Sequence, residues 1–164
     1  LPAPLRYFHA LQGDHVLNGW VQVQGPASFA SAVLARFLGT PLRAQDGELR
    51  FELAAQETCE TWTRHFPGKT MRSHLSMEPG RLVEQVGGAR LAFAVEGNAQ
   101  GLVMRLVGLR VLGVPCPHCL LPAVVAEESG SPGRLHFRIQ ASLPLLGRVA
   151  GYQGYLQLPD GEAA

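Results

Sequence analysis

The residues best placed to do chemistry are an arginine and a glutamate set among apolar side chains. In Trp62-x-Arg64-x-Phe66, the alternation of a β-strand would put all three side chains on one face. Glu84 has a similar setting, with an apolar residue two positions away on each side. A buried guanidinium needs a carboxylate or several carbonyls as partners. The pattern therefore predicts that Arg64 and Glu84 meet in one concave interior.

A polar group at the bottom of an apolar pocket typically anchors a ligand. The leading hypothesis is an accessory domain that binds a small apolar or amphipathic molecule in a curved sheet. Trp62 and Phe66 would line the pocket, Arg64 with Glu84 would supply its polar end, and Met104 is a candidate wall. Alternatively, Arg64 and Glu84 have no role in binding: they form a purely structural ion pair, or their strand face is solvated.

A second functional hypothesis is an enzyme, of a hydrolase-like or isomerase-like kind, in a helix-grip-like cavity. Glu84 would then be the general acid or base. A deep cavity that holds Glu84 without a cation nearby would favour this hypothesis. The sequence alone does not decide whether the chain is an enzyme.

Cys116-Pro117-His118-Cys119 resembles the redox motif of thioredoxin-fold disulfide oxidases. In those proteins the first cysteine begins a helix, whereas here prolines flank the motif and no amphipathic helix follows. A single Cys-x-x-Cys also supplies only two thiolates for zinc. We therefore expect a proline-rich connection between strands, with no metal site and no cofactor.

Composition limits the class of protein. The 164 residues, 46% apolar and 16% charged, fit one folded domain. A net charge of +1 provides no global field that would attract nucleic acid or an anionic membrane. No membrane-spanning segment or signal peptide is visible, and three cysteines suit a reducing compartment, so a cytoplasmic location is predicted. Because the chain begins without Met, we expect residues 1–164 to be one domain, excised from or homologous to the C-terminal part of a longer protein.

The best helix signal covers residues 27–38. Pro26 suits its first turn and Gly39 suits the position after its end. A stripe at helical spacing is expected to pack on a sheet; it consists of Phe29, Val33, Leu34 and Phe37. A shorter helix is expected over residues 4–11.

Most of the remaining chain alternates with period two, as strands do. The expected strands cover residues 16–24, 48–53, 62–66, 71–77, 82–86, 91–95, 102–106, 134–139 and 151–158. A hairpin is expected across Gly87-Gly88. These patterns predict an α+β domain: a large curved antiparallel sheet of about eight strands packed on one main helix, a helix-grip-like or lipocalin-like half-barrel.

Taken in order, short motifs along nearly the whole chain resemble the bacterial family called domain of unknown function 4166. The motifs are Leu5-x-x-Phe8-His9, Gly19 with Gly25, Trp62-x-Arg64-x-Phe66, Ser73, Leu82-x-Glu84 before Gly87, Gly101-Leu102-x-Met104, Leu112-Gly113-x-Pro115, Leu143-Pro144-x-x-Gly147 and Tyr152-x-Gly154-x-Leu156. The two cysteines of the Cys-x-x-Cys motif depart from the family pattern.

The resemblance implies no activity. It does imply a possible partner, because the domain in that family often stands alone or is joined behind a nucleotide-binding reductase-like or epimerase-like domain. A third hypothesis is therefore a structural module that packs on such a fused domain. A broad exposed apolar patch would be its signature.

Overall fold

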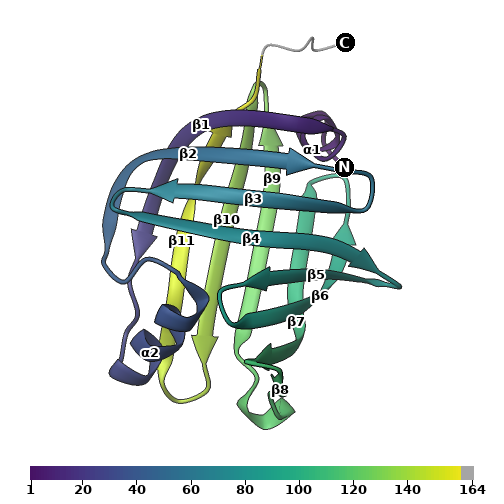
Figure 1. Ribbon diagram of the computed structural model, residues 1–164. Coiled ribbons are helices and arrows are strands. Elements are labelled where there is room, and N and C mark those ends of the chain that lie inside the picture. Colours follow the sequence, from purple (N-terminus) through teal and green to yellow (C-terminus); the bar gives the residue numbers. More distant parts are fainter. Residues whose placement is uncertain (160–164) are drawn as a thin grey trace.

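The computed structural model describes residues 1–159, which form a closed β-barrel with two short helices (Figure 1). The helices are α1 (Ala3–His9) and α2 (Phe29–Leu38), and a 3₁₀ turn, η1, covers His118–Leu120. The strands are β1 (Gly13–Gln24), β2 (Gln45–Ala55), β3 (Cys59–Phe66), β4 (Lys69–Glu78), β5 (Arg81–Val86), β6 (Ala89–Gly97), β7 (Gly101–Val111), β8 (Val114–Pro115), β9 (Ala123–Ser131), β10 (Arg134–Leu143) and β11 (Gly147–Gln157).

The barrel is an up-and-down meander in which neighbours in sequence pair antiparallel. Strands β1 to β7 follow one another around the wall, β9 to β11 complete it, and β11 pairs back with β1. The two-residue strand β8 extends β7 only. The expected α+β half-barrel on one main helix is therefore wrong. Ten strands close on themselves, and closure removes the open edges that a curved sheet would leave.

Glycines allow the seam between β1 and β11 to close. A Cβ added to Gly154 would collide with the carbonyl oxygen of Trp20, and one added to Gly19 would collide with that of Tyr155. The two strands approach too closely there for any side chain.

Helix α2 covers the lower end of the barrel in Figure 1 and packs mainly against β11. The Ser28 side chain accepts a hydrogen bond from the Ser31 amide at its start, and Gly39 ends it at φ 71°. Its inner face is Ser31, Ala35 and Leu38.

The expected inner stripe of α2 is largely wrong. Of its four residues only Leu34 packs against the core; Phe29, Val33 and Phe37 are exposed, and Phe29 keeps 87% of its surface. Because the barrel wall already supplies the apolar interior, α2 needs only a narrow strip of contact.

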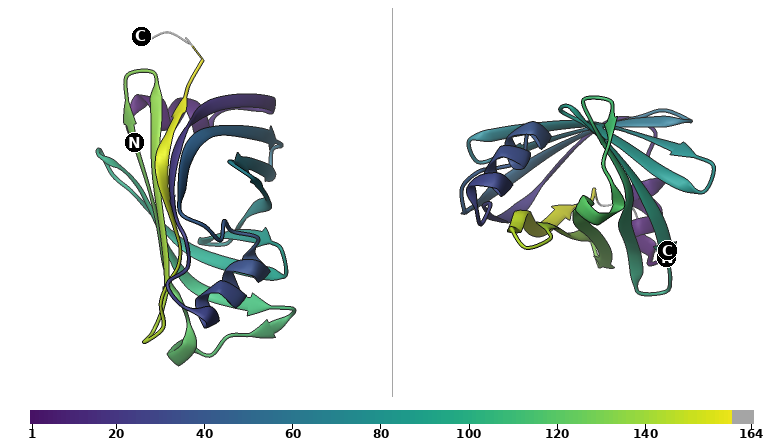
Figure 2. Two further views of the ribbon diagram at one scale, coloured as in Figure 1. Left: turned by 90° about the vertical axis from the view of Figure 1, so that its left-hand side faces the viewer. Right: turned by 90° about the horizontal axis from the view of Figure 1, so that it is seen from below.

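Helix α1 lies at the opposite end, against β9 and β10 (Figure 2). Its Leu5 and Phe8 are buried. The Phe8 ring meets those of Phe51 and Trp62 at centroid distances of 5.8 and 6.1 Å. The ends of the barrel interior are thus covered by α1 on one side and α2 on the other.

Candidate functional site

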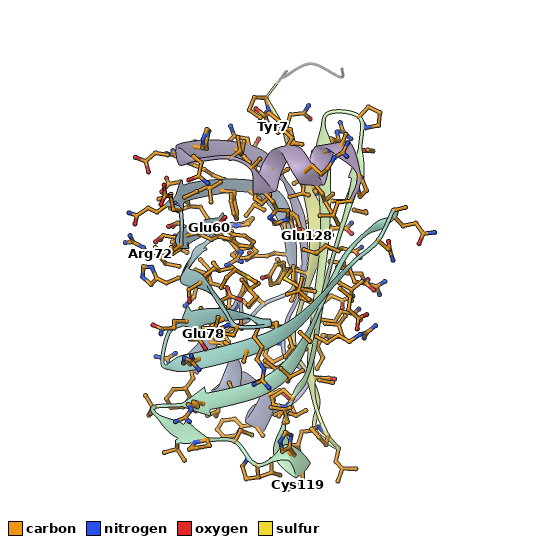
Figure 3. All side chains as sticks on the ribbon, turned by 90° about the vertical axis from the view of Figure 1, so that its right-hand side faces the viewer. Tyr7, Glu60, Arg72, Glu78, Cys119 and Glu128 are labelled. Atoms are coloured by element: carbon orange, nitrogen blue, oxygen red, sulfur yellow. The ribbon has the colours of Figure 1, made fainter. Side chains whose placement is uncertain are left out.

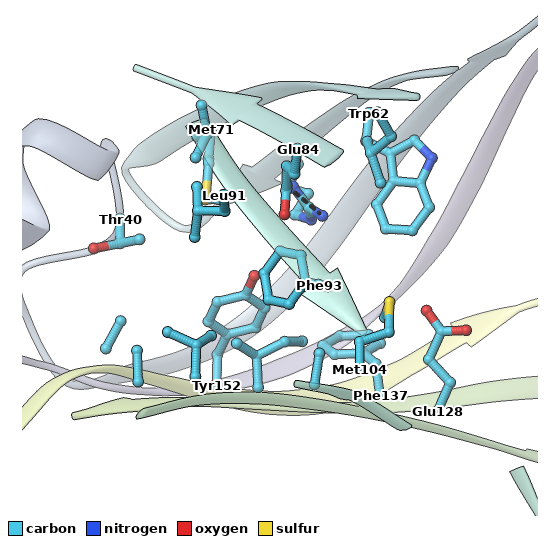
Figure 4. A pocket seen from close by; sticks show the side chains of 18 of the residues that line it. Thr40, Trp62, Met71, Glu84, Leu91, Phe93, Met104, Glu128, Phe137 and Tyr152 are labelled. Atoms are coloured by element: carbon cyan, nitrogen blue, oxygen red, sulfur yellow. Dashed lines mark ion pairs between the residues drawn. The ribbon is translucent and has the colours of Figure 1, made fainter. Parts of the chain in front are cut away.

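A cavity of about 110 Å³ lies inside the barrel. It extends from Thr40, near α2, to Phe8 and Glu128, near α1. Most of its lining is aliphatic or aromatic (Figure 4). The described polar or charged lining residues are Thr40, Trp62, Arg64, Glu84, Glu128 and Tyr152. An engineered apolar cavity of about 150 Å³ accepts benzene, so this space suits a molecule of only a few heavy atoms.

Arg64 and Glu84 form an ion pair in the cavity wall, as the sequence predicts. Arg64 comes from β3 and Glu84 from β5, with β4 between them. The Arg64 Nη2 lies 3.5 Å from the Glu84 Oε1, and the two side chains keep only 9% and 15% of their surface. Arg64 also donates a 3.0 Å hydrogen bond from Nη1 to Ser73 Oγ, and its guanidinium carbon lies 4.9 Å from the centre of the Trp62 ring.

The Glu84 carboxylate is not fully satisfied by this pairing. Its Oε1 is buried and accepts no hydrogen bond within the described part of the chain. A buried acceptor without a donor costs about 1–3 kcal/mol, and more when it is charged. A ligand that brings a donor to this oxygen would recover that free energy.

Tyr152, on β11, is the other polar group of this region. Its hydroxyl points across the cavity toward Glu84 (Figure 4). Burial raises the pKa of Tyr152 above 10.0; the charge of Arg64 opposes this rise, and that of Glu84 adds to it. The phenol therefore stays protonated at neutral pH and is available as a hydrogen-bond donor.

A second charged pair lies at the α1 end. His9 Nε2 lies 2.7 Å from Glu128 Oε2, which joins α1 to β9. Burial lowers the pKa of His9, but the hydrogen bond and charge of Glu128, and then the charge of Glu60, raise it overall above 6.5. The pair holds α1 on the barrel and supplies a counter-charge for the buried Glu128.

An outer groove of about 430 Å³ lies beside the α1 end. It shares four lining residues with the inner cavity: Trp62, Leu75, Leu82 and Met104. The Trp62 Nε1 donates a 2.7 Å hydrogen bond to Glu60 Oε2, which fixes the indole in this shared wall. These four side chains thus separate groove and cavity, and their movement would connect the two spaces.

Four of the five candidate residues line the cavity: Trp62, Arg64, Glu84 and Met104. Phe66 is buried on the same face of its strand, but it packs edge-on against Tyr152, with ring centroids 5.2 Å apart. It therefore supports the cavity wall through Tyr152.

Sequence reasoning missed Glu128, Tyr152 and His9 as members of the site. Glu128 was missed because strand β9 was not predicted, although Val124 and Ala126 precede it at period two and share its inward face. Tyr152 lies in an expected strand, but an inward tyrosine resembles ordinary core. No sequence pattern relates His9 to its partner Glu128, because the two residues are 119 positions apart.

The cysteine motif lies at the other end of the molecule. Cys119 lies in the loop at the lower end, far from Glu128 (Figure 3). Cys59, Cys116 and Cys119 are all free thiols, and only Cys116 is partly buried. Among residues 1–159, no group of three or more His, Cys, Asp or Glu residues is arranged to hold a metal ion. No helix in the same range is long and apolar enough to cross a membrane.

Comparison with known proteins defines the family. Residues 1–156 match the family described as Domain of unknown function (DUF4166), and the chain belongs to it. A solved structure with the same fold is titled "Crystal Structure of Rv2717c from M. tuberculosis". It has a TM-score of 0.51 and 12% identity over 97% of this chain and 99% of that chain. Comparison with curated proteins gives no match.

Proposed function

We propose that this DUF4166 domain is a binding protein for a small, mainly apolar molecule that carries one hydroxyl group. The observation that carries the proposal is the buried Glu84 carboxylate, which belongs to the lining of a mainly apolar cavity and whose Oε1 accepts no hydrogen bond within the described part of the chain. Enclosed pockets with few, well-placed polar groups are typical of small-molecule sites.

The charge of the site favours a neutral ligand. Arg64 and Glu84 compensate each other, and Glu128 is matched by His9 when the imidazole is protonated. A ligand carboxylate would meet Glu84 as a like charge, and a ligand cation would have to share it with Arg64. A hydroxyl fits better, because it can donate to Glu84 and accept from the Tyr152 phenol.

Size sets a further limit. The cavity of about 110 Å³ is smaller than one that accepts benzene without rearrangement. Met71 and Met104 line it, and methionine side chains change rotamer readily to fill or vacate space. With these methionines moved aside, a phenol-sized molecule is the upper limit of the expected class, and a longer apolar tail would have to leave through the wall formed by Trp62.

The enzyme alternative is less favoured. A deep cavity that holds Glu84 without a cation nearby would favour it, whereas Arg64 Nη2 lies 3.5 Å from Glu84 Oε1. A fused reductase-like partner stays a prediction from the family resemblance. A cytoplasmic location is part of the proposal, and the free thiols of the three cysteines suit it.

Phenol and toluene provide a direct test, because they differ only in a hydroxyl and a methyl group. Titrations followed by NMR should show both entering the cavity, with phenol bound more tightly in the wild-type protein. In Tyr152→Phe, the preference for phenol should fall by about three- to tenfold, because one neutral hydrogen bond is lost. Tyr155→Phe is the matched control, since Tyr155 lies on the outer face beneath Arg134.

Two results would overturn the proposal. If neither phenol nor toluene binds at concentrations up to about 10 mM, the proposed binding function is refuted. Equal affinity of the wild-type protein for phenol and toluene would show that the polar groups do not select a hydroxyl.

A further inference from the structure

The α2 end of the barrel exposes an unusual number of large apolar side chains. We call this surface the apolar end. It comprises Phe29, Val33, Phe37, Leu42, Leu112, Val114, Leu120, Leu145 and Leu146. They belong to α2, the following loop, the β7–β8 turn, β8, η1 and the β10–β11 turn, which gather at the lower end of the molecule (Figures 1 and 2). Exposed apolar groups concentrated in this way mark interaction surfaces.

Backbone contacts show that these segments are neighbours. The Leu112 amide donates to the Gly88 carbonyl, and the Gly88 amide donates to the Phe37 carbonyl, at 2.8 and 3.4 Å. On the other side of α2, the Ala27 amide donates to the Arg148 carbonyl at 2.8 Å. The β7–β8 turn, α2 and the β10–β11 turn thus form one continuous surface.

Two leucines at this surface have a backbone conformation that leucine disfavours. Leu112 has φ 50° and Leu145 has φ 63°, and they are the described non-glycine residues with positive φ. Glycine or asparagine adopts this region at lower cost. Leu145 is fully exposed and Leu112 is 70% exposed, so neither gains core packing in return. A strained, exposed leucine at the tip of a turn is explained if the side chain is buried by something outside the chain.

The charges carried by these segments are all positive. Residues 25–44, 86–89, 110–122 and 143–148 contain four arginines and none of the chain's 13 acidic residues. The arginines are Arg36, Arg43, Arg110 and Arg148, and all four are exposed. The acidic residues lie outside these segments of the sequence, so the near-neutral net charge conceals a basic end.

We propose that the apolar end docks on the surface of an anionic lipid bilayer. Apolar tips of separate turns would enter the boundary between headgroups and acyl chains, and the arginines would lie at the level of the lipid phosphates. A fused protein domain would satisfy the apolar residues, but it does not account for the uniform positive charge. This inference stands independently of the cavity and its ligand.

Flotation with vesicles tests the proposal. The full chain should float with phosphatidylcholine vesicles that contain about one third phosphatidylserine, and much less with phosphatidylcholine alone. Binding should weaken with added salt. In Arg36→Gln/Arg43→Gln, the affinity for the anionic vesicles should fall by about tenfold or more.

A second variant separates docking from folding. Leu112→Asn/Leu145→Asn should unfold at the same or a higher temperature than the wild type, because asparagine tolerates positive φ. It should nevertheless lose most vesicle binding. Met77→Asn is the control, since Met77 is 67% exposed on β4, outside the apolar end.

Two results would refute the membrane-docking proposal. Wild-type protein that does not float with anionic vesicles, or a Leu112→Asn/Leu145→Asn variant that floats as well as wild type, refutes membrane docking. Concentration-dependent dimerisation that is abolished by the same variant, without vesicle binding, would assign the surface to a second copy of the chain.

Discussion

Replacing Arg64 by methionine should destabilise the protein far more than replacing Arg64 and Glu84 together. The two side chains keep 9% and 15% of their surface, so each charge depends on the other for compensation. Removing one partner of a buried pair typically costs about 3–5 kcal/mol, whereas replacing both by apolar groups is often neutral or stabilising.

The geometry of this pair predicts a cost at the low end of that range of about 3–5 kcal/mol. The ions are 3.5 Å apart, and Glu84 retains some exposure. We expect Arg64→Met to cost about 3 kcal/mol, which lowers the midpoint of thermal unfolding by about 6–12 °C in a chain of this size. Glu84→Met should cost less, because Arg64 keeps its hydrogen bond to Ser73 and its contact with the Trp62 ring.

Urea unfolding of the two single variants and the double variant gives the coupling energy. Tryptophan fluorescence, to which Trp62 in the site and the exposed Trp20 both contribute, and far-ultraviolet circular dichroism follow unfolding of the barrel. The double variant should lie within about 1 kcal/mol of wild type. If the single losses are below about 0.5 kcal/mol and simply add, the pair is solvated and the reasoning about the buried site is wrong.

Three further predictions concern other parts of the barrel. Because the pKa of His9 is raised in the folded protein, the stability gained from its pairing with Glu128 is complete below about pH 6.5 and is lost as pH rises through the folded pKa. The stability of wild type relative to His9→Gln should therefore fall as the pH rises from about 6 to 8, and a flat difference in urea unfolding would contradict this. Gly154→Ala should cost at least about 3 kcal/mol or prevent folding, because its Cβ would meet a backbone carbonyl. The control, Gly108→Ala, should change stability by under about 1 kcal/mol, because its Cβ would lie 3.6 Å from Ala92. Equal losses in thermal unfolding would refute the claim that glycine is needed where β1 and β11 meet. Trp62→Leu should speed dissociation of phenol by about tenfold in NMR exchange measurements, and an unchanged rate would mean that ligands enter elsewhere.

The sequence predicts the strands better than their assembly. Period-two alternation identifies most of the wall, and Gly87-Gly88 correctly marks the turn between β5 and β6. Closure is not a local property. It depends on two pairings: that of β11 with β1, which are distant in sequence, and that of β7 with β9, between which other segments intervene. Strand β9 itself was not predicted.

Helix α2 shows a different limit of sequence reasoning. Its apolar periodicity predicts a buried stripe, but Phe29 and Phe37 are on the outer side. Periodicity reports that a face avoids water; it does not distinguish the protein's own core from an external surface. The mistaken stripe is thus the same observation that supports docking of the apolar end.

The ion pair was predictable because an inward charge violates the strand pattern twice, at Arg64 and again at Glu84. The hydrogen-bonding and polar groups around the ion pair were harder to predict. Tyr152 and Ser73 resemble core residues in sequence, and only their positions on neighbouring or opposite strands bring them to the pair.

The chain's three methionines allow the most direct test of the binding site. Met71 and Met104 line the cavity, whereas Met77 is exposed and lines the outer groove. With methyl-labelled methionine and phenol as ligand, nuclear Overhauser effects measure which methyl groups the bound ring touches. Effects at Met71 and Met104, without one at Met77, are the result expected for a ligand inside the barrel. An effect at Met77 alone, or none at any methyl group under conditions where phenol is saturating, would contradict the account.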